Sequence, residues 1–377
     1  MVVATLNILT TGFTAFYVIA VLFLRRGWIR LPINKVFCKL PGTSVTVVIA
    51  ARNEEMNIGA TIQDVLDQDY PPGLLEVIIV NDHSTDSTGG VVRSFENRGV
   101  RLIEFKESQP LNSYKKKALS KAIAEASGEL IVATDADCRM GREWLKAMVG
   151  EYEERGLLLV SGPVAFNKER NLFERLQTLE FLYLIGLGGA SIGNGKPSTC
   201  NGANLAYRRD VFYELGGFSG IDDLASGDDE LFLHKVAEKY PERIGFCKNR
   251  NAIVTTQAKE TLQSFISQRK RWASKSTRYK NKWVVFLGVS IWLFNVLLAS
   301  SLLVAFTGFE TWNVFIGCFL AKMAVEFLFL QPVCRFANRS SYLKLLPFLS
   351  VLHVLYLIYI GVAGNSGKYQ WKGRRVR

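Results

Sequence analysis

Two carboxylates at the end of an apolar segment are the residues of this chain that could most readily do chemistry. Residues 129–134 are mostly apolar and β-prone, and Asp135 and Asp137 follow at their end. Mg²⁺ and Mn²⁺ are hard cations that take one or two protein carboxylates and complete their coordination with phosphate oxygens. The Asp-x-Asp pair therefore predicts a site for a divalent cation and a phosphate group. The alternative is a solvated turn or a helix cap.

A second acidic group precedes a helical pattern. Asp228 and Asp229 stand directly before residues 230–236, whose apolar positions have helical spacing. Carboxylates at a helix N-terminus complement the helix dipole, an effect of roughly 0.3–1 kcal/mol. The alternative is a general base, a carboxylate that takes the proton of an attacking hydroxyl group.

The elements that must position these groups alternate along residues 40–280. Strands are predicted at residues 44–51, 75–81, 100–105 and 129–134, and helices at 54–68, 86–97, 115–126 and 142–155. Such a βαβ series predicts an α/β fold with a parallel sheet covered by helices on both faces. Ligands of these sheets bind outside the carboxyl ends of the strands. No GxGxxG follows the first strand, which argues against a dinucleotide oxidoreductase.

The two ends of the chain predict membrane helices. Residues 6–24 and 284–306 are runs of 19 and 23 residues without a charge, each long enough to cross about 30 Å of hydrocarbon. Residues 314–330 and 345–362 are shorter candidates. The basic residues Arg25, Arg26 and Arg30 follow the first run rather than precede it, which is typical of a retained anchor whose N-terminus lies outside.

Charge and cysteine content narrow the class of protein. The formal net charge is +12, but the basic residues are spread and many flank the apolar runs, so the positive-inside rule explains them better than a nucleic-acid partner does. The six cysteines form no CxxC pair, which fits a reducing, cytosolic compartment.

The predicted organisation is an N-terminal anchor at residues 1–30, a cytosolic domain at 40–280 with an interfacial helix over 261–280, a membrane region of about three helices at 284–364, and a basic tail at 365–377. Three C-terminal crossings would place the basic tail outside, against the positive-inside rule. Lys322 and Glu326 are four residues apart and can pair within a bundle. A re-entrant or interfacial helix is the alternative, because an even number of crossings after the domain returns the tail to the cytosol.

Seven sequence blocks occur in an order that resembles glycosyltransferase family 2, in its membrane-integrated branch. They are VVIAARNEE (residues 47–55), VIIVNDHSTDST (77–88), 115–123, TDADC (134–138), CNGANLAYRRDVFYELGGF (200–218), GDDELFLHKV (227–236) and QRKRW (268–272). The resemblance implies a GT-A (Rossmann-like) nucleotide-sugar-binding domain flanked by transmembrane helices. It also implies an inverting enzyme that uses Mg²⁺ or Mn²⁺.

The resemblance also implies roles for single residues. Ala51, Asn53 and Glu54 would border the nucleotide, and Asp82 would accept a hydrogen bond from its base, unless Asp82 only turns the chain. Lys115 would contact the diphosphate, with Lys116 as an alternative that the sequence leaves open.

The remaining motifs would complete the site. Asp137 would ligate the metal, and Asp135 would lie near the ribose or the metal. Asp229 would be the base, with Asp228 at a position where family members commonly have Glu, so the sequence leaves open which of the two acts. The family's QxxRW motif corresponds to Gln268, Arg271 and Trp272, which share one helix face and would line the donor and acceptor sites.

The function expected from these features is transfer of a sugar from a nucleotide-diphosphate sugar, UDP-linked by expectation, to a lipid or other membrane-associated acceptor. The alternatives are a processive polysaccharide synthase and a non-catalytic nucleotide-sugar-binding scaffold. We expect an integral protein of the plasma or inner membrane that can form a homo-oligomer. Residues 172–195, apolar but interrupted by Glu174 and Glu180, are predicted as a helix plus a flexible loop near the acceptor path.

Overall fold

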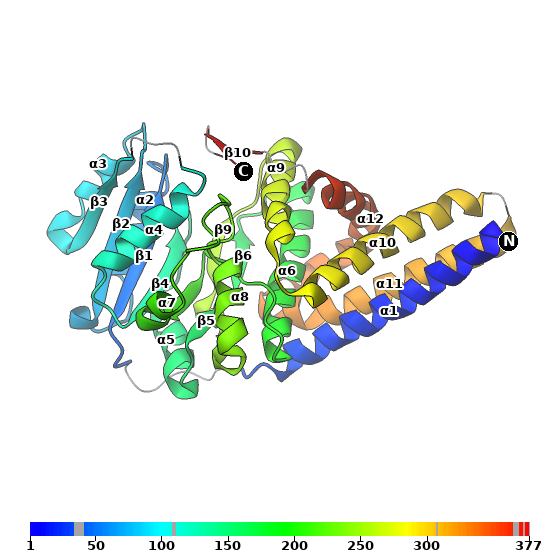
Figure 1. The fold of residues 1–377 in the computed structure, drawn as a ribbon, viewed down its shortest axis with the longest axis horizontal. Helices are drawn as coiled ribbons and strands as arrows, with labels where there is room; N and C mark the ends of the chain where they lie inside the picture. The colour runs from blue at the N-terminus through cyan, green and yellow to red at the C-terminus, as the bar shows by residue number, and fades with distance from the viewer. Residues whose placement is uncertain (34–40, 108–110, 307, 365–368, 372–373, 377) are drawn as a thin grey trace.

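The computed structural model describes residues 1–33, 41–107, 111–306, 308–364, 369–371 and 374–376, and Figure 1 shows their arrangement. An α/β domain with a central sheet lies at one end of the molecule, and long helices extend from it toward the other end. Most of the predicted basic tail at 365–377 lies outside the described residues. Its described parts form a short antiparallel hairpin of β10 (Tyr369–Trp371) and β11 (Arg374–Val376).

The central sheet has seven strands in the order β3-β2-β1-β4-β7-β5-β8. Their bounds are β1 Val45–Ala51, β2 Leu75–Asp82, β3 Val100–Phe105, β4 Leu130–Asp135, β5 Leu159–Ser161, β7 Leu205–Arg208 and β8 Ile244–Phe246. The four predicted strands correspond to β1–β4, which are parallel to one another. Parallel strands place their carboxyl ends at one edge, so residues after β1, β2 and β4 come together there.

The parallel arrangement predicted for the first four strands is confirmed, but the sheet continues with strands that the sequence did not predict, and one of them reverses direction. β7 runs antiparallel to both β4 and β5, and β6 (Val164–Asn167) pairs with β9 (Val254–Gln257) in a separate two-stranded sheet. The sequence pattern could not reveal this reversal, because alternation within a four-residue strand says nothing about its direction.

Helices cover the sheet where the sequence predicts them, with shorter bounds at some ends. They are α2 Ile58–Leu66, α3 Thr88–Arg93, α4 Tyr114–Glu125, α5 Trp144–Arg155 and α8 Glu230–Lys239. The short helix α7 (Arg209–Glu214) was not predicted. α4 packs against β1 and β2, whereas α5 packs against β5 and β8. The strands between them are almost fully buried, so burial of apolar side chains holds the layers together.

Residues 172–193 form one helix and only 194–195 lie in a turn, so the segment does not contain the longer loop that was predicted. α6 spans Leu172–Gly193 without a break, and the Asn171 side chain caps it by accepting from the backbone N–H of Glu174. The interrupting acids are buried with partners, Glu174 beside Arg170 and Glu180 beside Arg269. Glycines let α1 approach: a Cβ on Gly193 would lie 2.2 Å from a backbone oxygen of α1.

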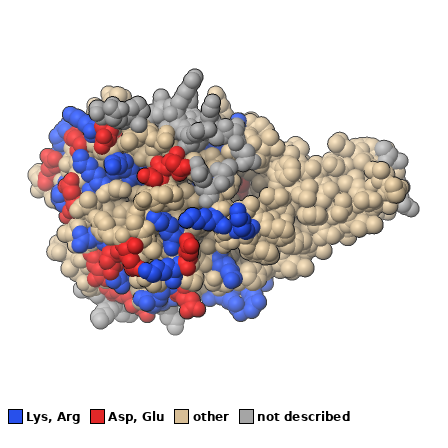
Figure 2. Space-filling model, in the orientation of Figure 1, with Lys and Arg blue, Asp and Glu red and all other residues tan. Residues whose placement is uncertain are grey.

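Among the described residues, four helices have the length and apolar composition of membrane spans: α1 (Val2–Arg30), α10 (Lys282–Ala305), α11 (Phe309–Phe336) and a helix that includes α12 (Leu346–Ala363). α1, α10 and α11 run side by side away from the sheet (Figure 1), and we call these three helices the helical arm. The face of the arm seen in Figure 2 carries no Lys, Arg, Asp or Glu along most of its length. Such a surface matches the hydrocarbon region of a bilayer.

α12 does not extend along the arm but lies against the domain. Ser350 near its start donates to Glu326 of α11, 3.2 Å apart, and Tyr356 in its middle donates to Glu180 of α6. At its end, a Cβ on Gly364 would lie 2.6 Å from the Cβ of Ala273 in α9 (Leu262–Ser274). α12 thus packs on α10 and α11 of the arm as well as on α6 and α9.

A buried ion pair joins the arm helices. The ammonium of Lys322 contacts Glu326 at 2.7 Å, as their i,i+4 spacing predicts, and the Tyr17 hydroxyl of α1 donates to the same carboxylate at 2.6 Å. Both charged side chains are almost fully buried. The carboxylate thus links α1, α11 and α12.

Removal of one charge of this pair should cost far more than removal of both. We expect Glu326→Ala to lower the free energy of unfolding by about 3–5 kcal/mol, because it leaves the Lys322 ammonium buried without its carboxylate. The double substitution Lys322→Met with Glu326→Leu should be nearly neutral. Unfolding in mixed detergent micelles measures both, and equal losses in the single and double variants would contradict this account.

Candidate functional site

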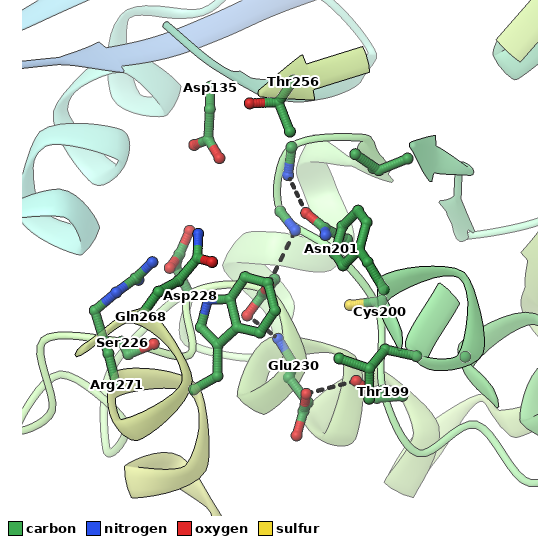
Figure 3. A pocket seen from close by; sticks show the side chains of 18 of the residues that line it. Asp135, Thr199, Cys200, Asn201, Ser226, Asp228, Glu230, Thr256, Gln268 and Arg271 are labelled. Carbon is green, nitrogen blue, oxygen red and sulfur yellow. Dashed lines mark hydrogen bonds between the residues drawn. The ribbon is translucent and has the colours of Figure 1, made fainter. Parts of the chain in front are cut away.

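A cavity of about 570 Å³ lies at the carboxyl ends of β1, β2 and β4, and it extends between α6, α9, α10 and α12. Eleven of the twelve predicted site residues line it: Ala51, Glu54, Asp82, Lys115, Asp135, Asp137, Asp228, Asp229, Gln268, Arg271 and Trp272. Figure 3 shows Asp135, Asp228, Gln268 and Arg271 around one space. Residues at the ends of the parallel strands thus share one cavity with residues of α9, which lie far from them in the sequence.

Asn53 is the exception and does not line the cavity. Its backbone is left-handed, with φ of 50°, a conformation that Asn tolerates better than most residues. Its side-chain oxygen accepts from the backbone N–H of Thr85 at 2.9 Å, and its own N–H donates to Ser84. Asn53 thus joins the loops that follow β1 and β2, and its contact with a nucleotide stays a prediction.

Asp82 lies at the end of β2, and its side chain is held by His83, for which the sequence predicted no role. The two side chains are 2.8 Å apart. The other ring nitrogen of His83 accepts from the backbone N–H of Glu107 at 2.9 Å, so the ring proton belongs on Nδ1, which donates to Asp82. Asp82 is buried yet lines the cavity, an arrangement suited to accepting a ligand N–H.

Lys115 lies between two carboxylates. Its Nζ is 2.8 Å from Asp135 and 3.1 Å from Asp228. Burial would raise the pKa of Asp135, but the Lys115 ammonium outweighs it and holds that pKa below its usual value. Burial would lower the pKa of Lys115, and Asp135 with Asp228 raises it instead. The pair is therefore charged at physiological pH.

Lys116, the alternative that the sequence left open, does not line the cavity. Its buried Nζ donates to the backbone carbonyls of Ile221, Leu224 and Ser226, each at 2.7 Å. Burial lowers the pKa of Lys116 to about 8. The lysine thus ties the segment before Asp228 to the start of α4.

Asp229 is held on several sides. Its two oxygens accept from the backbone N–H groups of Glu230, at 2.7 Å, and of Gly202, at 2.9 Å. Lys275, which the sequence analysis missed, lies 3.6 Å from Asp229 and 2.9 Å from Glu230. Burial would raise the pKa of Asp229, but Lys275 and these N–H groups lower it to about 2. Asp229 is therefore ionised and fixed in orientation.

The buried pair of Arg269 and Glu180 positions the QxxRW residues. Arg269 contacts both oxygens of Glu180, and its guanidinium lies 4.3 Å from the ring centroid of Trp272. It also donates to the Gln268 side chain at 2.6 Å. Arg271 and Gln268 extend from α9 toward Asp228 (Figure 3). The sequence could not identify Arg269, because Glu180 is 89 positions away.

The carboxylates after β4 fit a divalent cation. Asp135 and Asp137 both line the cavity and supply hard oxygen ligands. Among the described residues no group of three or more His, Cys, Asp or Glu converges, so a cation here would need oxygens from a bound ligand as well. This donor set suits Mg²⁺ or Mn²⁺ with a diphosphate.

The far part of the cavity is apolar. Leu184 and Ile185 of α6, Val284 and Gly288 of α10, and Tyr356 and Ile360 of α12 line it, and we call this part the apolar end. The cavity therefore joins a charged region at the sheet to an apolar region between helices.

The contacts of Lys116 predict a local effect. We expect Lys116→Met to speed hydrogen–deuterium exchange of residues 219–229 at least about tenfold, because three buried carbonyls lose a charged donor. The neighbouring Lys117 is exposed, so Lys117→Met is the control and should leave exchange unchanged. Equal exchange in both variants would show that the lysine does not hold this segment.

Comparison with known proteins adds three kinds of finding. Residues 46–216 match the family model described as "Glycosyl transferase family 2". A "Probable glycosyltransferase YdaM" of Bacillus subtilis is 32% identical over 236 residues, which cover 61% of this chain and 54% of that protein. The mannosyltransferase PcManGT from Pyrobaculum calidifontis, in complex with GDP-Man and Mn²⁺, has a similar fold, with a TM-score of 0.61 and 21% identity over 93% of this chain and 99% of that chain.

Other curated relatives differ in their products. The beta-monoglucosyldiacylglycerol synthase of Synechocystis is 25% identical over 65% of this chain and 50% of that protein. The poly-beta-1,6-N-acetyl-D-glucosamine synthase of Staphylococcus epidermidis is 25% identical over 61% of this chain and 53% of that protein. The chain thus spans about half the length of the curated relatives it matches.

Proposed function

Because residues 46–216 form a glycosyltransferase family 2 domain with the predicted GT-A fold, we propose that this protein is an inverting, metal-dependent glycosyltransferase. It transfers a sugar from a nucleotide-diphosphate sugar to a lipid or other membrane-associated acceptor. The observation that carries the proposal is the single cavity in which Asp82, Asp135, Asp137, Asp229 and Arg271 meet.

The charged region suits the donor. Asp82 accepts an N–H of the base, and Lys115 and Arg271 face the diphosphate, since both line the cavity near Asp135. A divalent cation held by Asp137 and Asp135 would neutralise the charge that develops on the leaving diphosphate. UDP-sugars are the first donors to test, and GDP-mannose follows because PcManGT is in complex with GDP-Man.

Asp229 is the proposed base. Its low pKa makes it a weak base before reaction, but the acceptor hydroxyl becomes strongly acidic as its oxygen bonds to the anomeric carbon. Fixed orientation then matters more than basicity. Asp228 contacts Lys115 instead, so we assign it to the donor side of the cavity.

The helical arm supports membrane attachment, since its helices match the length and composition of bilayer spans. We propose that α1, α10 and α11 cross the membrane while α12 lies at its surface. With the domain in the cytosol, this topology places the N-terminus outside and the basic tail inside, as the positive-inside rule requires.

Substitution of the acidic residues tests the enzyme proposal. We expect Asp137→Ala to lower kcat/KM by more than about 100-fold. Loss of a residue that only hydrogen-bonds to a metal ligand costs about 10–100-fold, and loss of the ligand itself should cost at least as much. Asp229→Asn should lower kcat by ~10²–10⁴-fold with little change in KM. Asp228→Asn should mainly raise KM for the donor.

Release of nucleotide from radiolabelled donors, with Mn²⁺ or Mg²⁺, measures these effects. The exposed Asp222 offers a matched control, and Asp222→Asn should behave as wild type. Full activity of Asp137→Ala would leave the non-catalytic scaffold as the explanation. A larger loss of kcat in Asp228→Asn than in Asp229→Asn would exchange the two assigned roles.

Lys275 should set the acid limb of the pH profile. Lys275 lowers the pKa of Asp229, so Lys275→Met should raise that pKa. The base would then become protonated at a higher pH than in wild type. The acid limb of kcat/KM should therefore move upward in pH, while Lys280→Met, at an exposed position nearby, should leave it in place. An unshifted limb in Lys275→Met would contradict the assignment of Asp229 as the base.

A further inference from the structure

The apolar end of the cavity has surface available to a ligand. Leu184 is 37% exposed although α6 is largely buried, and it lines the cavity. A Cβ placed on Gly288 would meet no atom within 4 Å, so α10 leaves open space there. Water in an apolar pocket makes few hydrogen bonds, and an apolar ligand displaces it favourably.

The position of the apolar end indicates where such a ligand comes from. Two of the three helices that form it, α10 and α12, have the length and composition of membrane spans. The apolar end therefore lies at the level where the protein meets lipid. The catalytic carboxylates line the same cavity, so a molecule with its chain in the apolar end can reach them with its head group.

α12 has an exposed apolar face and lines the cavity with other side chains. Its exposed apolar side chains recur every three or four residues and so share one face: Phe348, Leu352, Leu355, Tyr359 and Val362. Tyr356 and Ile360 lie on the cavity side. A helix with one apolar face exposed and the other against the protein suits the boundary of the acyl region.

We propose that the apolar end binds the hydrocarbon chain of the acceptor lipid, which enters beside α12 from the bilayer and presents a hydroxyl group to Asp229. The proposal rests on the glycosyltransferase function and specifies its acceptor. The acceptor oxygen bonds to the anomeric carbon as the bond from that carbon to the diphosphate oxygen breaks. The hydroxyl proton passes to Asp229, and the nucleotide diphosphate leaves.

Charge favours a hydroxyl head group over a phosphate. The acceptor head group would lie beside Asp228, Asp229 and Glu230, which line the cavity. The nearby lysines Lys115 and Lys275 already contact these carboxylates. An anionic head group would be repelled by these carboxylates, because the two lysines already pair with them. The apolar walls also disfavour a growing polysaccharide, whose hydroxyl groups would lose hydrogen bonds to water there.

The test uses the full-length protein in detergent and a long-chain alcohol with a diazirine at mid-chain as the probe. After irradiation, mass spectrometry maps the labelled peptides. The proposal predicts labelling of the α6 peptide that contains Leu184 and Ile185. Gly288→Leu should reduce that labelling at least about tenfold, because the added side chain fills the open space. Gly317→Leu is the matched control, since Gly317 also has no atom within 4 Å of a Cβ, lies in α11 and does not line the cavity.

Two further measurements separate this proposal from the proposed function. Donor hydrolysis without acceptor, measured in Gly288→Leu beside the control Gly317→Leu, reports on the donor region separately from the apolar end. Should Gly288→Leu not fold, Val284→Trp, one turn earlier on α10, replaces it. Equal labelling of α6 in wild type and in Gly288→Leu would overturn the proposal. An octadecyl phosphate that outcompetes the alcohol probe for this site would overturn it as well. Correct labelling without turnover of any donor would instead contradict only the enzymatic function.

Discussion

The buried ion pair of Arg269 and Glu180 is the interaction on which the site depends. It joins α9, which carries the QxxRW residues, to α6, and Tyr356 of α12 donates to the same carboxylate. Burial of two charges has a large desolvation cost. Close contact between the two groups, together with further contacts to each of them, is needed to offset it. The contact of Arg269 with both Glu180 oxygens and its stacking on Trp272 supply them. Three walls of the cavity are thereby fixed relative to one another.

Charge balance governs the rest of the cavity. The carboxylates of Asp135, Asp228, Asp229 and Glu230 would repel one another without the two buried lysines, Lys115 and Lys275, that lie between them. A diphosphate that enters must share Lys115 with these carboxylates, so a divalent cation at Asp135 and Asp137 would restore the balance. The proposed need for a cation rests on the arrangement of charges as much as on the Asp-x-Asp motif.

Much of the site was predictable because its residues follow strands whose order and direction the sequence indicates. Asp82 and Asp135 lie at strand ends, and parallel pairing of β1, β2 and β4 brings them to one edge. Gln268, Arg271 and Trp272 share a helix face because of their spacing.

What the sequence could not show depends on partners far along the chain. Arg269 and Lys116 stand beside predicted site residues, yet their roles come from Glu180 and from carbonyls about 105 to 110 positions away. Neither spacing nor residue type indicates such partners. The same limit applies to α12: its composition fits a membrane span, but the sequence does not show that it packs on α10 and α11 as well as on α6 and α9.

The central claim is that one cavity joins a nucleotide-sugar site to an apolar acceptor site. The most direct measurement is the fate of sugar from radiolabelled UDP- and GDP-sugars, with Mn²⁺ or Mg²⁺, when the detergent-solubilised protein is supplied with membrane lipid. The account predicts label in the organic phase as a species with one sugar and an inverted anomeric centre. Label in a high-molecular-weight polymer, or no metal-dependent release of nucleotide with any donor, would contradict it.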